Sequence, residues 1–330
     1  QHYLNRYHKA MEALNVLPPS IEPHASGHII EQIALVKEIL DNGYAYESEG
    51  SVYFDVAKYD KAHHYGVLSG RNLEDVLNTT RELDGQSEKR NPADFALWKY
   101  SPTDTKRQME WDSPWGIGFP GWHAECSAMS MKLLGEHFDV HTGGEDLSRV
   151  HHANEIAQSE PITGAPWVNT WLHYSFLLDK SGEKMAKSKG EFLGMDAVRK
   201  RGYDPMVYRY FVALGHYQSQ LAFSWETMDA SANGYANLVR RVSDLLSSEN
   251  GTVNETVYGE WHDKMLAAMS DNLKTASVLV FVQDFIKSTE IDNATKLALV
   301  KFADDLLGLQ FIDRAKRLVA LEQESAPAEI

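Results

Sequence analysis

Cysteine is almost absent from this chain of 330 residues, which contains a single one, Cys126. One cysteine excludes a framework of intramolecular disulfides and suits a reducing compartment. No apolar run approaches the roughly 20 residues that a transmembrane helix needs. The N-terminal residues carry no signal-peptide pattern either. We therefore expect a cytoplasmic protein without a membrane span.

Positive charge is also scarce, because 32 Lys and Arg residues face 47 Asp and Glu residues, which leaves a formal net charge of −15. Such an excess argues against a general nucleic-acid binder. It does not exclude RNA binding, since the local charge matters more than the sum. Basic residues gather at Lys180–Lys189, Arg199–Arg201 and Arg240–Arg241. The simpler interpretation of each group is a solvated helix face.

Helical and strand signals alternate in the first part of the chain, which is long enough for more than one domain. A helix is expected over Gly27–Asn42, with Ser26 as its N-cap and Gly43 as its stop. Short alternating segments around Glu49-Gly50 predict a hairpin. After Lys189 the pattern becomes helical, and we expect a helical bundle. One of its apolar stripes consists of Tyr235, Leu238, Val239, Val242, Leu245 and Leu246.

Three further segments organise the middle of the chain. Lys58–Trp115 is rich in Gly, Pro, Asn and charge, and indicates an irregular β insertion outside the main sheet. Phe138–His141 is typical of a strand that leads into Thr142-Gly143-Gly144. Trp171–Leu178 is expected to form a buried strand, followed by a turn at Asp179–Gly182. The fold class that these segments indicate is α/β with a helical appendage.

Cys126 can be considered together with His151 and Glu155 as a possible metal-binding group. His151 and Glu155 stand four residues apart and would share one face of a helix. A thiolate, an imidazole and a carboxylate are three zinc-type ligands, one short of a closed tetrahedral site. The alternative is equally simple. A free cysteine is often a small buried apolar residue, and the histidine would then cap its helix.

Lys184-Met185-Ala186-Lys187-Ser188-Lys189-Gly190 is a cationic segment that could close over a triphosphate. Its alternative interpretation is a solvated lysine turn. The segment follows the predicted strand Trp171–Leu178, and α/β sheets place their ligands at the ends of strands. This position favours the phosphate interpretation.

Several of these segments together resemble one family. Gly121–Glu160 is similar to the zinc-site core of the cysteinyl-tRNA synthetases, which are class I aminoacyl-tRNA synthetases. Lys184–Ser188 is similar to the class I KMSKS signature, with Ala186 in place of the first serine. The resemblance is strong to about residue 228 and weaker beyond. Further matching segments are Ala13–Pro19, Leu68–Arg71, Lys89–Lys99, Trp111–Gly116 and Arg209–Tyr217.

The resemblance implies a partial Rossmann-like catalytic core with a β-rich connective insertion, followed by an α-helical bundle. The expected segments are a helical part of the core at 1–43, the insertion at 44–118, the second half of the core with the zinc site at 119–178, the KMSKS loop with a stem-contact region at 179–228, and a tRNA-binding bundle at 229–330. The implied activity is that of a cysteine--tRNA ligase. Such an enzyme uses ATP to activate cysteine as an adenylate and transfers it to tRNA(Cys).

The resemblance also assigns roles to residues. Cys126, His151 and Glu155 are expected to bind Zn²⁺, which selects the substrate thiol. Trp122 and His141 would wall the cysteine pocket, unless they are a core aromatic and a hydrogen-bonded strand-end histidine. Lys184 and Lys187 would neutralise the phosphates of ATP together with Mg²⁺. The remaining ATP contacts are expected from the backbone of Gly143 and Gly144 and from Asp146, which could instead cap the helix of His151.

Two features of the family are missing. No HIGH-like quartet and no second cysteine precede Cys126, and the sequence opens at Gln1 and stops at Ile330. We interpret the chain as an internal piece of a longer synthetase that lacks the fourth zinc ligand and both ends. We therefore expect it to be inactive in tRNA aminoacylation by itself. The alternatives are a cysteine ligase of mycothiol synthesis and a non-catalytic synthetase fragment.

Overall fold

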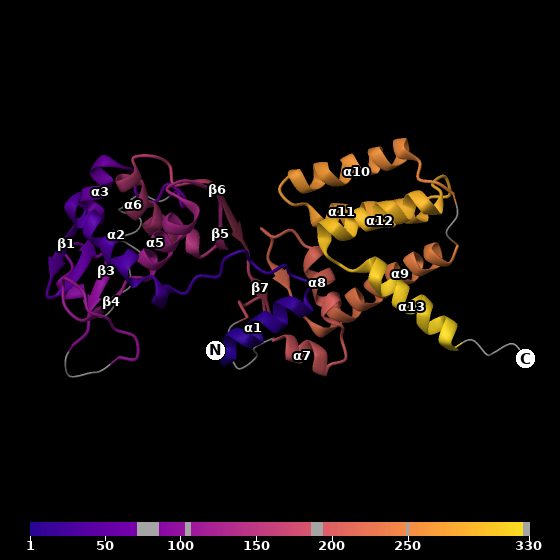
Figure 1. Ribbon diagram of the computed structural model, residues 1–330, viewed down its shortest axis with the longest axis horizontal. Coiled ribbons are helices and arrows are strands. Elements are labelled where there is room, and N and C mark those ends of the chain that lie inside the picture. Colours follow the sequence, from indigo (N-terminus) through magenta and orange to yellow (C-terminus); the bar gives the residue numbers. More distant parts are fainter. Residues whose placement is uncertain (71–85, 103–106, 186–193, 249–250, 326–330) are drawn as a thin grey trace, which may run out of the picture. The chain divides into compact units, whose positions relative to one another are not determined.

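The computed structural model describes residues 1–70, 86–102, 107–185, 194–248 and 251–325 (Figure 1). Its contacts divide the chain into two compact units. Unit 1 comprises Gln1–Ser20 and Ser175–Ile330, and unit 2 comprises Ile21–Tyr174. No helix in the described ranges is long and apolar enough to cross a membrane. The domain borders at residues 43, 118, 178 and 228 stay predictions, because contact density does not mark functional borders.

The described residues of unit 2 form two separate sheets. The first is antiparallel, in the order β1 (Ala45–Ser48), β2 (Ser51–Phe54), β3 (Phe95–Tyr100) and β4 (Gly118–Pro120). The predicted hairpin is confirmed, since Glu49 and Gly50 join β1 to β2 and both have positive φ, as a tight two-residue turn requires. The expected insertion thus contains a sheet of its own. It also contains the helix α3 (Val56–Ala62) and the 3₁₀ turn Gln86–Glu88.

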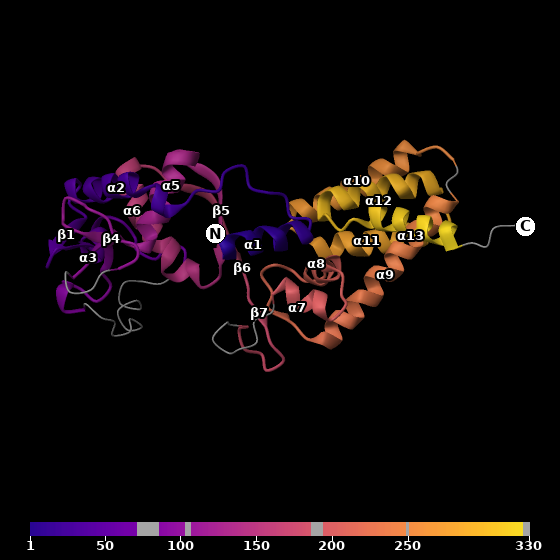
Figure 2. The same cartoon turned by 60° about the horizontal axis from the view of Figure 1, so that its bottom comes forward.

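The second sheet is a parallel pair formed by β5 (Phe138–Gly144) and β6 (Val168–Tyr174). Unit 2 also contains α2 (Ile29–Asp41), α5 (Trp122–Leu134) and α6 (His151–Thr163), which pack on one another. Helices α2 and α5 lie side by side in both views (Figures 1 and 2). Gly144 is paired with Tyr174, so the carboxyl ends of the two strands lie next to each other.

Two local predictions for unit 2 are wrong. Ser26 does not cap α2, because it lies in a 3₁₀ turn, Ala25–Gly27, and the helix begins at Ile29. The side chain of Gln32 donates to the carbonyl of Ala25 at 3.0 Å and so ties this turn to the helix. The expected strand Trp171–Leu178 is not continuous either. It ends at Tyr174, and its residues are exposed or half-buried rather than buried.

Unit 1 is mainly helical. One short parallel pair joins β7 (Leu177–Leu178) to β8 (Leu221–Ala222). The other described elements of this unit are helices, and those after β7 confirm the predicted helical bundle. Its helices are α1 (His2–Ala13), α7 (Met195–Lys200), α8 (Pro205–Ala213), α9 (Trp225–Ser247), α10 (Glu255–Ser270), α11 (Thr275–Lys287), α12 (Asn293–Leu307) and α13 (Phe311–Ser325). Ser224 and Thr227 form a capping box at the start of α9.

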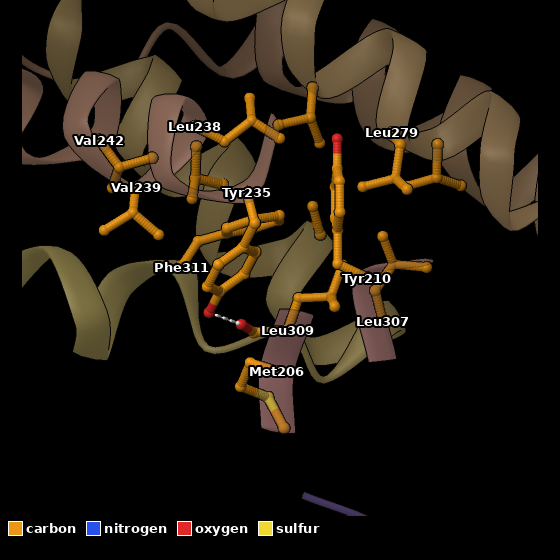
Figure 3. Close-up of a cluster of buried hydrophobic side chains, with 14 of the residues drawn as sticks. Met206, Tyr210, Tyr235, Leu238, Val239, Val242, Leu279, Leu307, Leu309 and Phe311 are labelled. Carbon is orange, nitrogen blue, oxygen red and sulfur yellow. Dashed lines mark hydrogen bonds between the residues drawn. The ribbon is translucent and has the colours of Figure 1, made fainter. Parts of the chain in front are cut away.

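The core of the bundle gathers side chains from α8, α9, α11, α12 and α13 (Figure 3). The apolar stripe of α9 faces this core, and its Tyr235 hydroxyl donates to the carbonyl of Leu309 at 2.6 Å. Arg209 joins α1 to the same unit. Its guanidinium donates to the carbonyls of Leu14, Asn15 and Leu307, at the C-terminal ends of α1 and α12. These are the ends at which the helix dipole favours a cation.

Candidate metal centre

The centre is built on the first two turns of α5 and α6. Gly121, just before α5, must be glycine, because a Cβ there would lie 2.0 Å from the carbonyl oxygen of Ala96 in β3. The Gly121 amide donates to the carbonyl of Leu97 at 2.8 Å. This close approach fixes the start of α5 against the antiparallel sheet. It therefore sets the position of Cys126, on the second turn of the helix.

The structure brings the three predicted metal ligands together. Ligand atoms of Cys126, His151 and Glu155 all lie within 4.8 Å of one another. His151 and Glu155 are buried on α6, and Cys126 is half-buried on α5. The set contains one sulfur, one nitrogen and one carboxylate oxygen, which is a zinc-type donor set.

Glu155 is a fully buried carboxylate whose two oxygens face different histidines. Its Oε2 accepts a hydrogen bond from His141 Nε2 at 2.8 Å. Its Oε1 lies 2.8 Å from His151 Nε2 but has no hydrogen-bond partner within the described part of the chain. Buried polar atoms are nearly always paired. Glu155 Oε1 and His151 Nε2 therefore have the arrangement expected of two ligands that bind one metal ion.

Electrostatics around Glu155 keep this carboxylate charged. Burial by itself would raise the pKa of Glu155, but the hydrogen bond from His141 and the charge of the nearby His151 ring outweigh it and lower that pKa to about 2. The opposite holds for Cys126. Burial, followed by the negative charge of Glu155, raises the pKa of the Cys126 thiol to about 12. A bound cation reverses this tendency, because it stabilises the thiolate.

His123 is a member of the centre that the sequence interpretation missed. Its Nδ1 lies 2.7 Å from Nδ1 of His151, and burial lowers the pKa of His123 to about 3. A neutral His123 can accept the Nδ1 proton of His151, which leaves Nε2 of His151 free to bind a metal. The spacing of His123 and Cys126, three residues apart on one helix, was the signal that would have included it.

The two residues expected to wall the substrate pocket lie beside the ligands. The Trp122 ring lies against His151 with centroids 4.1 Å apart and ring planes tilted by 33°, and 58% of Trp122 is exposed. His141 is hydrogen-bonded, as in the alternative interpretation, and its partner is Glu155, but it lies within β5 rather than at its end. It also belongs to a second group of possible ligands, with His152 and Glu155. His141 thus orients the Glu155 carboxylate, and a role in substrate binding stays a prediction.

Four of the five residues predicted to contact ATP lie in the described ranges. Gly143 and Gly144 end β5 in unit 2. Gly143 has a packing reason to be glycine, because a Cβ there would lie 2.6 Å from the His152 ring. Asp146 does not cap the helix of His151, since the N-cap residue of α6 is Val150. Lys184 lies in unit 1. Its ammonium lies 3.7 Å from the centre of the Phe176 ring, and Lys187 is outside the described residues.

Comparison with known proteins decides the family. Residues 1–233 match the family described as tRNA synthetases class I (C) catalytic domain. The chain belongs to this family. A cysteine--tRNA ligase of Bacteroides fragilis is 53% identical over 94% of the chain, and one of Phocaeicola vulgatus is 55% identical over 86% of it. The chain spans 64% and 59%, respectively, of the length of these two relatives.

A solved class I synthetase has the same fold. The methionyl-tRNA synthetase of Mycobacterium tuberculosis, in complex with methionyl-adenylate, aligns with 97% of this chain and 80% of its own. The TM-score is 0.59 at 15% sequence identity. The likeness supports the fold class derived from the sequence, an α/β class I core followed by a helical bundle.

Proposed function

We propose that this chain is part of a cysteine--tRNA ligase, which activates cysteine with ATP and transfers it to tRNA(Cys). The observation that carries the proposal is the buried cluster of Cys126, His151 and Glu155, in which Glu155 Oε1 has no hydrogen bond to any described residue. The cluster fits a zinc ion, to which these three side chains would be ligands. When bound, zinc supplies a soft Lewis acid that can bind the substrate thiol as a thiolate.

The residues around the cluster define what each ligand can do. His141 fixes one oxygen of Glu155 and turns the other toward His151. His123 fixes the tautomer of His151. Trp122 covers the His151 ring and excludes water from one side. A hydroxyl is a poorer ligand than a thiol for such a centre, so serine is rejected at the binding step.

Activation of the amino acid requires no nucleophile from the protein. The carboxylate of cysteine attacks the α-phosphate of ATP in line, and the protein contributes positioning and charge neutralisation. Lys187 is proposed to contact the phosphates, with Lys184 and Mg²⁺ sharing the charge. Gly143, Gly144 and Asp146 are proposed to contact the nucleoside, because they lie at or just after the carboxyl end of β5, where α/β sheets bind ligands.

The partners follow from the same proposal. The bundle at 229–330 is proposed to bind tRNA(Cys), and the local basic residues Arg240 and Arg241 of α9 are exposed. The single cysteine suits the cytoplasm, which is the proposed location.

ATP–pyrophosphate exchange in the full-length protein tests this function. We expect exchange with cysteine and at least about 10³-fold less with serine, the scale on which a site built for one polar group rejects its analogue. Removal of zinc by a chelator should abolish the exchange, and added zinc should restore it. A protein that binds zinc but shows no exchange with any amino acid would support the non-catalytic alternative.

A further inference from the structure

The turn between α10 and α11 has an unusual backbone. Asn272 and Leu273 are consecutive non-glycine residues with φ of 59° and 54°. Left-handed conformations are uncommon for such residues, and for leucine more than for asparagine. Leu273 is 42% exposed, so burial of its side chain does not account for its conformation. A strained backbone persists only where surrounding contacts determine it, and those contacts can be named.

Asn272 binds three consecutive residues of the loop between α8 and β8. Its backbone carbonyl accepts from His216 Nε2 at 2.8 Å. Its side-chain oxygen accepts from the Tyr217 hydroxyl, and its amide nitrogen donates to Gln218 at 3.0 Å. Thr275, three residues on, donates its hydroxyl to the carbonyl of Ala213 at 2.9 Å, at the end of α8. The turn thus holds this loop along its whole length.

The loop in turn holds the segment that carries Lys184. The Tyr217 carbonyl accepts from the amide of Ser175 at 2.8 Å, just before β7. The Phe176 carbonyl accepts from Leu221, and β7 pairs with β8. Lys184 returns beside β7 by a bridge to Leu178, with its ammonium over the Phe176 ring. A continuous set of hydrogen bonds therefore leads from Asn272 through Tyr217 to the hairpin of Lys184.

We propose that Asn272 is a positioning residue for the ATP site. By holding Tyr217 it fixes the start of β7, and through β7 it fixes the hairpin from which Lys184 reaches the phosphates. The proposal rests on the proposed function, because it assumes that Lys184 acts on ATP. The Asn272 proposal goes beyond the proposed function, because it assigns a role to a residue of the helical bundle that is not proposed to contact any substrate.

Two substitutions in the full-length protein test the role. Asn272→Ala removes both side-chain hydrogen bonds, and Tyr217→Phe removes only the hydroxyl. We expect each to lower kcat/KM for ATP about three- to tenfold in ATP–pyrophosphate exchange, the scale of losing the neutral hydrogen bond between Asn272 and Tyr217, which both changes remove. The KM for cysteine should not change, since cysteine is bound by unit 2. The double variant should be no worse than Asn272→Ala, because both changes remove the same bond.

Helix α10, which precedes the turn of Asn272, offers a matched control. Asn254 caps the other end of α10, where its side chain accepts from the amide of Val257 at 3.2 Å. Asn254→Ala should lower the melting temperature to a similar degree and leave kcat/KM for ATP unchanged. Asn272→Asp keeps an acceptor for Tyr217 and should recover most of the lost ATP kinetics.

Hydrogen exchange gives a readout that does not depend on activity. Asn272→Ala should speed exchange of the backbone amides in residues 176–185, and Asn254→Ala should not. Unchanged ATP kinetics and unchanged exchange in 176–185 in both Asn272→Ala and Tyr217→Phe would overturn the proposal. If Asn272→Ala does not fold, Tyr217→Phe decides alone. If the wild-type protein lacks cysteine-dependent activity, the proposed function fails, while the amide exchange still decides whether Asn272 positions the hairpin.

Discussion

Replacing Cys126 by alanine in the full-length protein should remove bound zinc and lower cysteine-dependent ATP–pyrophosphate exchange by at least about 10³-fold. Cys126 is the thiolate donor among the described residues of the cluster. Its loss leaves a histidine nitrogen and a carboxylate oxygen as the described ligands, a much weaker set for zinc. Loss of zinc removes the group that selects the thiol, so the KM for cysteine should rise more than the KM for ATP.

The measurement is elemental analysis of the purified variant beside its activity. Ser130→Ala provides the matched control, because Ser130 lies on the same helix α5 and is not a member of the cluster. It should retain a full complement of zinc and normal kinetics. A Cys126→Ala variant with stoichiometric zinc would contradict the ligand assignment.

Replacing Lys187 by alanine should slow cysteine activation about 10²- to 10³-fold, the scale of losing one preorganised charge that stabilises the transition state. The change removes a cation proposed to face the phosphates of ATP as negative charge shifts toward the leaving pyrophosphate. Binding of cysteine should barely change, since the thiol is bound at the other end of the substrate.

Lys180→Ala is the matched control for this second prediction. Lys180 lies in the same segment of the chain, but its ammonium pairs with the exposed carboxylate of Glu226 at 2.8 Å. Exposed ion pairs of this kind contribute little to stability, so the rate of ATP–pyrophosphate exchange by Lys180→Ala should stay within about twofold of wild type. Near-normal single-turnover adenylate formation in Lys187→Ala would refute the role of Lys187.

The parts of the site that the sequence predicts are those fixed by local spacing. His151 and Glu155 share a face of α6 because they stand four residues apart, and this holds in any helix. The hairpin at Glu49-Gly50 is predictable for the same reason, since its turn depends on two residues. The pairing of Cys126 with His151 depends on the packing of α5 against α6, which the family resemblance supplied and spacing did not.

The parts that were missed depend on long-range contacts. Trp171–Leu178 has the apolar content of one buried strand, yet the amide of Ser175 bonds to Tyr217 and the chain leaves the sheet at Tyr174. The sequence offered a hydrogen bond as one alternative for His141 but could not name its partner, because the bond to Glu155 is set by where α6 lies against β5. Such partners are distant in sequence and leave no periodic signal. The contacts of Asn272 belong to the same class.

X-ray absorption at the zinc edge of the full-length protein tests the central claim most directly. The claim is that a zinc ion bound by Cys126, His151 and Glu155 takes the thiol of the substrate as a further ligand. Spectra with and without cysteine should differ by the gain of one sulfur neighbour, and serine should cause no such change. An unchanged sulfur shell at saturating cysteine would contradict the account, because selection of cysteine could not then occur at the metal.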